Sequence, residues 1–162
     1  MTINKYLAIP AALFFASSLS YAASSCTKLY NSKAYTEALT QCKEEAFHSN
    51  SQASFILGQM YENGLGVKTS SKKAVAYYQQ AVLANNLDSQ IALGLYHKKH
   101  QNYLLSHIYL TLAIENGSLG ACLEQEKVEQ KMSKDQLMLS SDYVNIVKSA
   151  ITDKKKSFAM ND

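Results

Sequence analysis

The chain has 162 residues, of which 47% are hydrophobic, and this is enough for one domain with a real core. The formal net charge is only +3, and lysine is its only strongly basic residue type, with no arginine present. Because proteins that read nucleic acids rely on arginine to contact bases and phosphates, this composition argues against a nucleic-acid partner.

Residues 1–22 have the pattern of a signal peptide. A lysine precedes an apolar run at 6–16 that is too short to span a bilayer, and Ser20-Tyr21-Ala22 then offers a small-x-small cleavage site. We therefore expect a mature protein in the periplasm of a Gram-negative bacterium, with no transmembrane segment. Lipidation of Cys26 is the alternative, although the leucine usually found three residues before a lipidated cysteine is missing.

Residues 23–50 are expected to form a short pair of helices. Cys26 lies eight residues before a proposed turn at Ala34, and Cys42 lies eight residues after it. These two positions are level in an antiparallel hairpin, so a disulfide between them would join the helices without much strain. The alternative is that both cysteines are small buried hydrophobic residues.

Residues 51–86 contain two helical patterns. Alanine, leucine and tyrosine recur every four residues from Ala53 to Tyr61, which predicts a first helix over residues 52–62. Apolar residues then recur at spacings of three and four up to Ala84, which predicts a second helix. Ser70 is a good N-cap for this second helix, because its side chain can accept an early backbone N–H.

The segment NGLGVKTS, residues 63–70, joins these two helices. A phosphate-binding loop needs Gly-Lys-Ser/Thr in direct succession after a strand, whereas here Val67 separates Gly66 from Lys68 and a helix comes first. We therefore expect Gly64 and Gly66 to provide the positive φ angles of a turn between helices, with Val67 inserted beneath it.

Residues 87–117 are a weaker copy of the same pattern. Leu57-Gly58 recurs 36 residues later as Leu93-Gly94, but His97-Lys98-Lys99-His100 replaces the glycine loop and the copy is four residues shorter. A tighter connection between its helices is expected. Two of these histidines and His107 could bind a metal, but the intervening lysines would repel a cation, so we favour a polar helix end.

Residues 118–156 are expected to form capping helices. Cys122 falls in the first of them, beside two leucines, and we expect it to lie in the core. Ser133-Lys134-Asp135-Gln136 reads as a capping box that opens a last amphipathic helix. We expect this helix to close the domain with a polar outer face, and residues 157–162 to be a flexible tail.

Residues 53–82 resemble a Sel-one-like repeat, a relative of the tetratricopeptide repeat. The matching positions are Ala53, Leu57-Gly58, Tyr61, Gly64-Leu65-Gly66-Val67, Ser70, Lys73-Ala74, Tyr77-Tyr78 and Ala81. Residues 26–46 resemble the shorter tetratricopeptide pair, and residues 89–117 resemble a degenerate Sel-one-like repeat. The resemblance implies an all-α fold, in the form of a right-handed α-solenoid of stacked antiparallel helix pairs.

The same resemblance implies a protein-interaction module with an adaptor, regulatory, assembly or toxin-neutralising role. Stacked helix pairs present a curved surface lined by their first helices, and such surfaces commonly bind proteins or peptides. From the helical phase we expect one protein partner to bind around Gln59, Glu62, Tyr96 and His97. We expect a monomer with no catalytic residue, no metal and no cofactor.

Two alternative functions belong to other classes. Cysteine-rich exported relatives in the family have been linked with cell-wall or β-lactam hydrolysis, but this sequence lacks their regular cysteine pair in each repeat. A lipid-anchored subunit of an envelope complex would instead require lipidation of Cys26.

Overall fold

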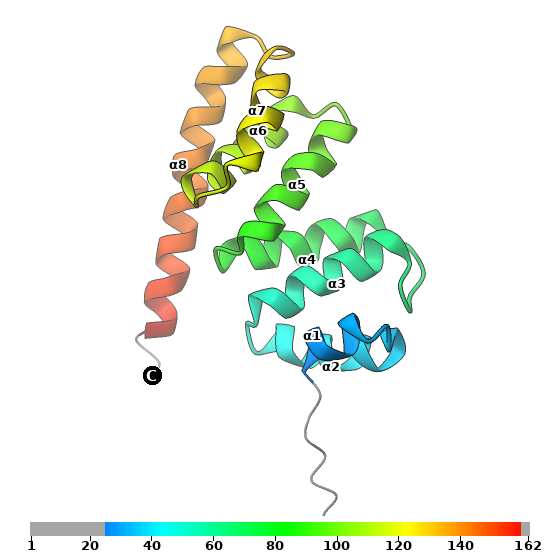
Figure 1. Ribbon diagram of the computed structural model, residues 1–162. Coiled ribbons are helices and arrows are strands. Elements are labelled where there is room, and N and C mark those ends of the chain that lie inside the picture. The colour runs from blue at the N-terminus through cyan, green and yellow to red at the C-terminus, as the bar shows by residue number, and fades with distance from the viewer. Residues whose placement is uncertain (1–24, 160–162) are drawn as a thin grey trace, which may run out of the picture.

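The computed structural model describes residues 25–159, and these residues form helices and no strand (Figure 1). The predicted all-α fold is therefore confirmed, whereas the predicted signal peptide lies outside the described residues. The helices are α1 (Cys26–Asn31), α2 (Tyr35–Phe47), α3 (Ser51–Asn63), α4 (Ser71–Leu83), α5 (Leu87–Lys99), α6 (Tyr103–Glu115), α7 (Gly120–Glu129) and α8 (Lys134–Ala159).

Neighbouring helices pack as hairpins, and the hairpins stack into a solenoid (Figure 1). Within the hairpins, α1 packs against α2, α3 against α4, and α5 against α6. Between them, α2 packs against α3 and α4 packs against α5. The second helix of each pair therefore joins two hairpins, while the first helices α3, α5 and α7 line one side of the stack, which we call the first-helix face.

A glycine in each of α3 and α5 allows the helices of its hairpin to approach closely. A Cβ atom on Gly58 would collide with the ring of Tyr78, and one on Gly94 would lie 2.7 Å from the side chain of Leu110. Tyr78 and Leu110 fill the space above these glycines and are almost completely buried. The recurring Leu-Gly pair of the sequence is thus explained by helix packing.

Aromatic rings stack at equivalent points of the two central hairpins. The ring centroids of Tyr61 and Tyr77 are 5.6 Å apart with an interplanar angle of 7°. His97 and Tyr109 repeat this arrangement, with centroids 5.6 Å apart and the same angle of 7°. Because residue 97 follows residue 61 by 36 positions, His97 takes the place of Tyr61 in the second hairpin.

The loop between α3 and α4 turns as the glycines predict. Gly64 and Gly66 have φ angles of 72° and 68°, and Gly64 is the left-handed C-cap of α3. Val67 is partly buried and packs against the hydrophobic clusters on both sides of the loop. The Oγ atom of Ser70 accepts the backbone N–H of Lys73, as expected of an N-cap. The connection between α5 and α6 is indeed tighter and comprises only residues 100–102.

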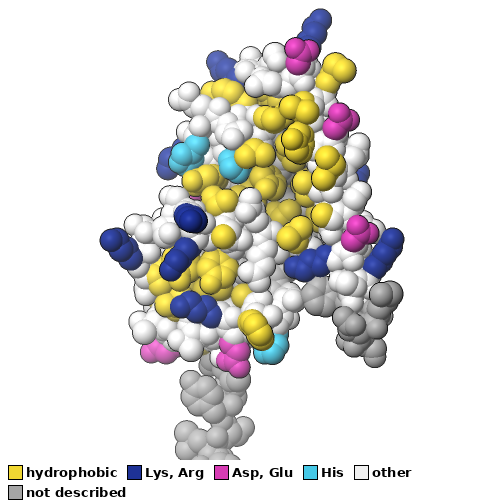
Figure 2. All heavy atoms as spheres, turned by 180° about the vertical axis from the view of Figure 1, so that it is seen from behind, with side chains coloured by type: hydrophobic (Ala, Val, Ile, Leu, Met, Phe, Trp, Pro, Cys, Tyr) yellow, Lys and Arg dark blue, Asp and Glu magenta, His cyan; other side chains and the backbone are white. Residues whose placement is uncertain are grey.

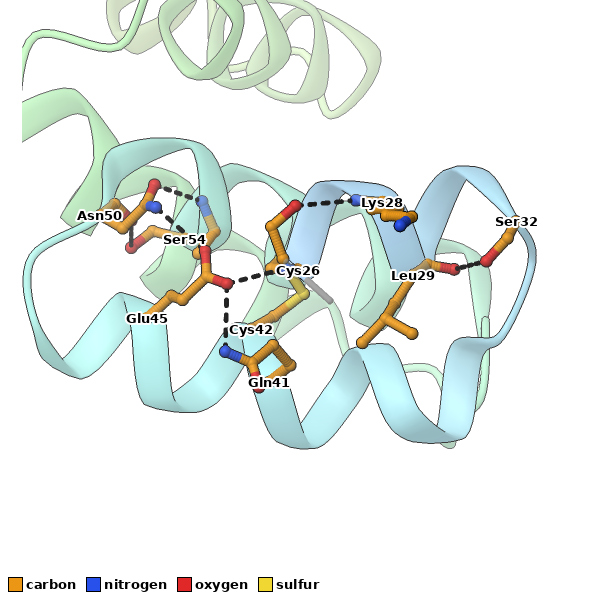
Figure 3. Close-up of a disulfide and its surroundings, with 11 residues drawn as sticks. Cys26, Lys28, Leu29, Ser32, Gln41, Cys42, Glu45, Asn50 and Ser54 are labelled. Atoms are coloured by element: carbon orange, nitrogen blue, oxygen red, sulfur yellow. Dashed lines mark hydrogen bonds between the residues drawn. A yellow bond between two sulfur atoms is a disulfide. The ribbon is translucent and has the colours of Figure 1, made fainter. Parts of the chain in front are cut away.

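A disulfide between Cys26 of α1 and Cys42 of α2 joins the first hairpin, with Cα atoms 4.6 Å apart (Figure 3). Glu45 lies beside it and accepts the backbone N–H of Cys26 at 2.7 Å and the side-chain amide of Gln41 at 3.2 Å. Its other oxygen accepts the side-chain amide of Asn50, which is the N-cap of α3. Glu45 therefore connects α1, α2 and the start of the next hairpin.

The last helix begins as predicted but ends later. The backbone N–H of Ser133 donates to Oε1 of Gln136, and the N–H of Gln136 donates to Oγ of Ser133, which confirms the capping box. The helix then continues to Ala159, so the expectation of a flexible tail is wrong for residues 157–159, and residues 160–162 lie outside the described part. No glycine or proline interrupts α8. The lysines near its C-terminus stabilise it further by a favourable interaction with the helix dipole.

The outer face of α8 is not polar throughout, which corrects a second expectation. The helix packs mainly against α6 and α4, and it buries Ser140, Val144 and Ile151 there. This contact uses only one stripe of α8, so other large apolar side chains stay exposed, namely Met138, Leu139, Tyr143 and Ile146. None of the helices within residues 25–159 is both long and apolar enough to cross a membrane.

The expectation that Cys122 lies in the core is wrong. On α7 the side chains of Ala121 and Val128 are buried, and they pack in a hydrophobic cluster with residues of α6. Cys122 follows Ala121 by one residue, so its side chain points about 100° further around the helix and is exposed to solvent. Leu119 and Leu123 are also exposed, at 86% and 65%.

Candidate functional site

A groove on the first-helix face is the candidate functional site. It has a volume of about 400 Å³ and lies between α3 and α5, above the second helix α4. α4 packs against both of these helices and holds them side by side. The residues that line the groove are Phe55, Gln59, Glu62, Tyr78, Asp88, Ile91, Ala92, Leu95, Tyr96 and Lys99.

Apolar side chains form the middle of this groove. Phe55 of α3 lies with its ring centroid 5.8 Å from that of Tyr78, which closes the groove from below. Ile91 is partly buried on the α5 side, and Leu95 remains 43% exposed. Concave surfaces that combine apolar anchors with a few polar groups are typical of binding sites.

An exposed apolar side chain on α7, Leu123, occupies the position that corresponds to two residues of the groove. Residues 55, 91 and 123 follow one another at spacings of 36 and 32, which are the lengths of the two repeating units. Phe55, Ile91 and Leu123 therefore occupy equivalent positions of α3, α5 and α7. We call these three residues the apolar stripe. Sequence reasoning missed the stripe, although the same repeat spacing that aligned the leucine-glycine pairs would have found it.

Polar side chains lie at the edges of the groove. The hydroxyl of Tyr78 donates a 2.6 Å hydrogen bond to Oε2 of Glu62. Burial, and then this hydrogen bond, raise the pKa of Tyr78 above its ordinary value of 10.0. Tyr78 therefore stays protonated at neutral pH and fixes the position of the Glu62 carboxylate. Asp88 and Lys99, both exposed, add one charge of each sign to the rim.

The structure brings together three of the four residues that the sequence assigned to partner binding. Gln59, Glu62 and Tyr96 line the groove, whereas His97 does not. His97 follows Tyr96 by one residue, and its ring turns away from the groove to stack on Tyr109. Burial, with a smaller effect of His100, lowers the pKa of His97 below its ordinary 6.5, so the ring is neutral at pH 7. Its role is packing.

The three histidines that could have formed a metal site do not converge, because His97 and His100 stay close together at the end of α5 while His107 lies on α6. The ring centroid of His100 lies 4.2 Å from that of Tyr96, while His97 stacks on α6. His107 belongs to α6, and its Nε2 atom lies 3.0 Å from Oε1 of Glu129 on α7. Among the described residues, no group of three or more histidine, cysteine or acidic side chains could hold a metal ion.

The chain contains two Ser-x-x-Lys motifs, a spacing used by some serine hydrolases. Our reading of the sequence did not identify them. They start at Ser25 and Ser70, and in both the serine Oγ accepts the backbone N–H of the lysine, Lys28 or Lys73, as a helix N-cap. The ammonium group of Lys73 instead lies over the ring of Tyr61, 5.0 Å from its centroid. Both serines therefore have a structural role in starting α1 and α4.

Comparison with known proteins agrees with this architecture. A family model of the Sel1 repeat matches residues 51–86 and again residues 87–118, which correspond to the hairpins α3–α4 and α5–α6. No curated protein shows significant similarity to the chain. Sel1 repeats generally mediate interactions between proteins. The chain is therefore a Sel1-like repeat protein, with two Sel1 repeats in residues 51–118.

Proposed function

We propose that this protein binds one protein or peptide partner in the groove between α3 and α5. The observation that carries the proposal is the apolar stripe of Phe55, Ile91 and Leu123, of which the first two line the groove and the third, at the equivalent position of α7, is largely exposed. A partner that covers these side chains removes apolar surface from water, and the charged rim of the groove orients it.

The proposed setting is the periplasm, where the protein would act as an adaptor, regulator, assembly factor or toxin-neutralising subunit. Two features support it: the signal-peptide pattern of residues 1–22, and the disulfide of the first hairpin, since disulfides persist in oxidising compartments. The disulfide occupies the Cys26 thiol that lipidation would require, so we favour a form without a lipid anchor. The capping role of Ser25 and Ser70 supports binding over hydrolysis.

Capture of the partner from a periplasmic extract tests the proposed site. We expect Leu95→Asp to reduce the captured partner by about tenfold or more, because the new carboxylate would be buried in an apolar contact. Leu83→Asp is the matched control, because Leu83 is 38% exposed on the second helix α4 and does not line the groove. It should retain the partner within about twofold.

The same circular dichroism spectrum for both variants would show that the fold is kept. If Leu95→Asp and Leu83→Asp capture the partner equally well, the groove is not the binding site.

A further inference from the structure

A second pocket lies between the second helices α2 and α4, next to the end of α3. It has a volume of about 400 Å³ and shares no lining residue with the proposed binding groove. The residues that line it are Lys43, Tyr61, Lys73, Ala76, Tyr77 and Gln80. We call it the lysine pocket.

The charged side chains that line the lysine pocket are all positive. Lys43 of α2 and Lys73 of α4 line it, and no acidic side chain does. In the part of the chain that the structure describes, neither ammonium group forms an ion pair. Helix α2 also carries Glu37, Glu44 and Glu45, but none of them lines the pocket. The two positive charges are therefore available to a ligand.

The charges around the pocket do not compensate the two lysines. Glu62 follows Tyr61 by one residue, but it lines the groove and accepts the hydroxyl of Tyr78 there. Lys72 precedes Lys73, and the first turn of α4 contains no acidic residue. In the view from behind, lysine side chains surround a hydrophobic area at the lower left of the molecule, and acidic side chains appear only beneath it (Figure 2). A pocket with this surrounding charge attracts anions.

The repeat architecture does not require these two lysines. By the repeat spacing of 36 residues, Lys43 corresponds to Gln79 of α4. By the shorter spacing of 32 residues, Lys73 corresponds to Leu105 of α6. The aromatic stack beside them, in contrast, recurs in the next hairpin with the same geometry. The stack is thus part of the repeat, whereas the two charges are specific to this pocket.

We propose that the lysine pocket binds a phosphate monoester. This group carries a charge of about −2 at neutral pH and three acceptor oxygens, so it matches two ammonium groups. The ammonium of Lys73 lies over the ring of Tyr61, 5.0 Å from its centroid, which restricts where this charge can lie. The pocket is larger than a phosphate group alone and leaves room for the rest of the ligand. Soluble phosphorylated compounds and lipid headgroups both carry this group.

Amide chemical shifts of the purified protein, followed by NMR during titration with methyl phosphate, test the site. We expect saturable shifts in α2 and α4 around the pocket, and weaker binding of methyl sulfate, which has the same shape but a single charge. Lys43→Gln should weaken methyl phosphate binding by about tenfold, because one of the two charged contacts is lost. Lys131→Gln is the matched control: it removes the same charge at an exposed position between α7 and α8, and should change the affinity by less than about twofold.

The absence of saturable shifts, or a Lys43→Gln variant that binds methyl phosphate no more weakly than Lys131→Gln, overturns the proposal. Equal binding of methyl sulfate overturns the preference for a doubly charged group. Circular dichroism of each variant confirms that the fold is kept. Leu95→Asp, which alters the groove, should leave methyl phosphate binding unchanged, so the two sites can succeed or fail separately.

Co-sedimentation with phosphatidylcholine vesicles, prepared with and without phosphatidic acid, identifies the source of the phosphate group. Binding that requires phosphatidic acid and is weakened by Lys43→Gln assigns a lipid headgroup to the pocket. Binding of methyl phosphate without binding to either vesicle assigns a soluble ligand.

Discussion

Replacement of Gly66 by valine should lower the free energy of unfolding by about 2–5 kcal/mol, the combined effect of backbone strain and overpacking. Gly66 has a φ angle of 68°, which a β-branched residue adopts only with strain. A Cβ atom at this position would also lie 2.8 Å from Cβ and 2.9 Å from the carbonyl carbon of Tyr35, at the start of α2. Because the obstacle includes backbone, it cannot move aside without displacing the first hairpin.

Chemical denaturation followed by circular dichroism measures this loss. The matched control is Gly120→Val, because nothing lies within 4 Å of a Cβ atom built on Gly120. The control should change the free energy of unfolding by no more than about 1 kcal/mol. If both variants lower the free energy of unfolding equally, the contact between the glycine loop and the first hairpin does not contribute to stability.

Removal of the disulfide by the double variant Cys26→Ala/Cys42→Ala should lower the free energy of unfolding by about 3 kcal/mol. The two cysteines are 16 residues apart in sequence, and the cross-link restricts the unfolded chain over this length. α1 has only six residues and packs mainly against α2 and α3 at this end of the stack. Such a short helix depends on tertiary contacts, so α1 should lose its protection from hydrogen exchange first.

Repeating the denaturation with a reductant separates the effect of breaking the disulfide from the effect of removing the two sulfur atoms. It should destabilise the wild type by a similar amount and leave the double variant unchanged. Cys122→Ser, at an exposed position, should change the free energy of unfolding by less than about 0.5 kcal/mol. Three reactive thiols in the unfolded, unreduced wild type would contradict the presence of the disulfide.

Local signals in the sequence were sufficient to predict most of the hairpin architecture. The glycine loop, the Ser70 cap and the Ser133–Gln136 capping box each act within a few residues, and the structure shows all three. The spacing of 36 residues between the two leucine-glycine pairs likewise identified the repeated hairpin, because each glycine meets a side chain of its own partner helix.

Three expectations failed because they depended on how helices meet in space. Cys122 is exposed because α7 turns a different face toward α6, and α8 leaves apolar side chains exposed because it crosses α6 and α4 along a single stripe. His97 was assigned to the binding surface from helical phase alone. Its equivalence to Tyr61, visible in the repeat spacing, would have indicated a stacking role.

Most of the groove was also beyond local reasoning. Gln59, Glu62 and Tyr96 were predicted to face outward from the phase of their own helices, and the structure places all three in the groove. Leu95 was not predicted, because an isolated exposed leucine has no functional meaning until the packing of α3 and α5 against α4 places it in a groove.

Hydrogen–deuterium exchange of the protein with its captured partner tests the binding face most directly. We predict that the partner slows exchange in α3, α5 and α7 and leaves exchange in the outer second helices α2, α4 and α6 unchanged. Protection confined to the second helices would contradict the assignment of partner binding to the first-helix face.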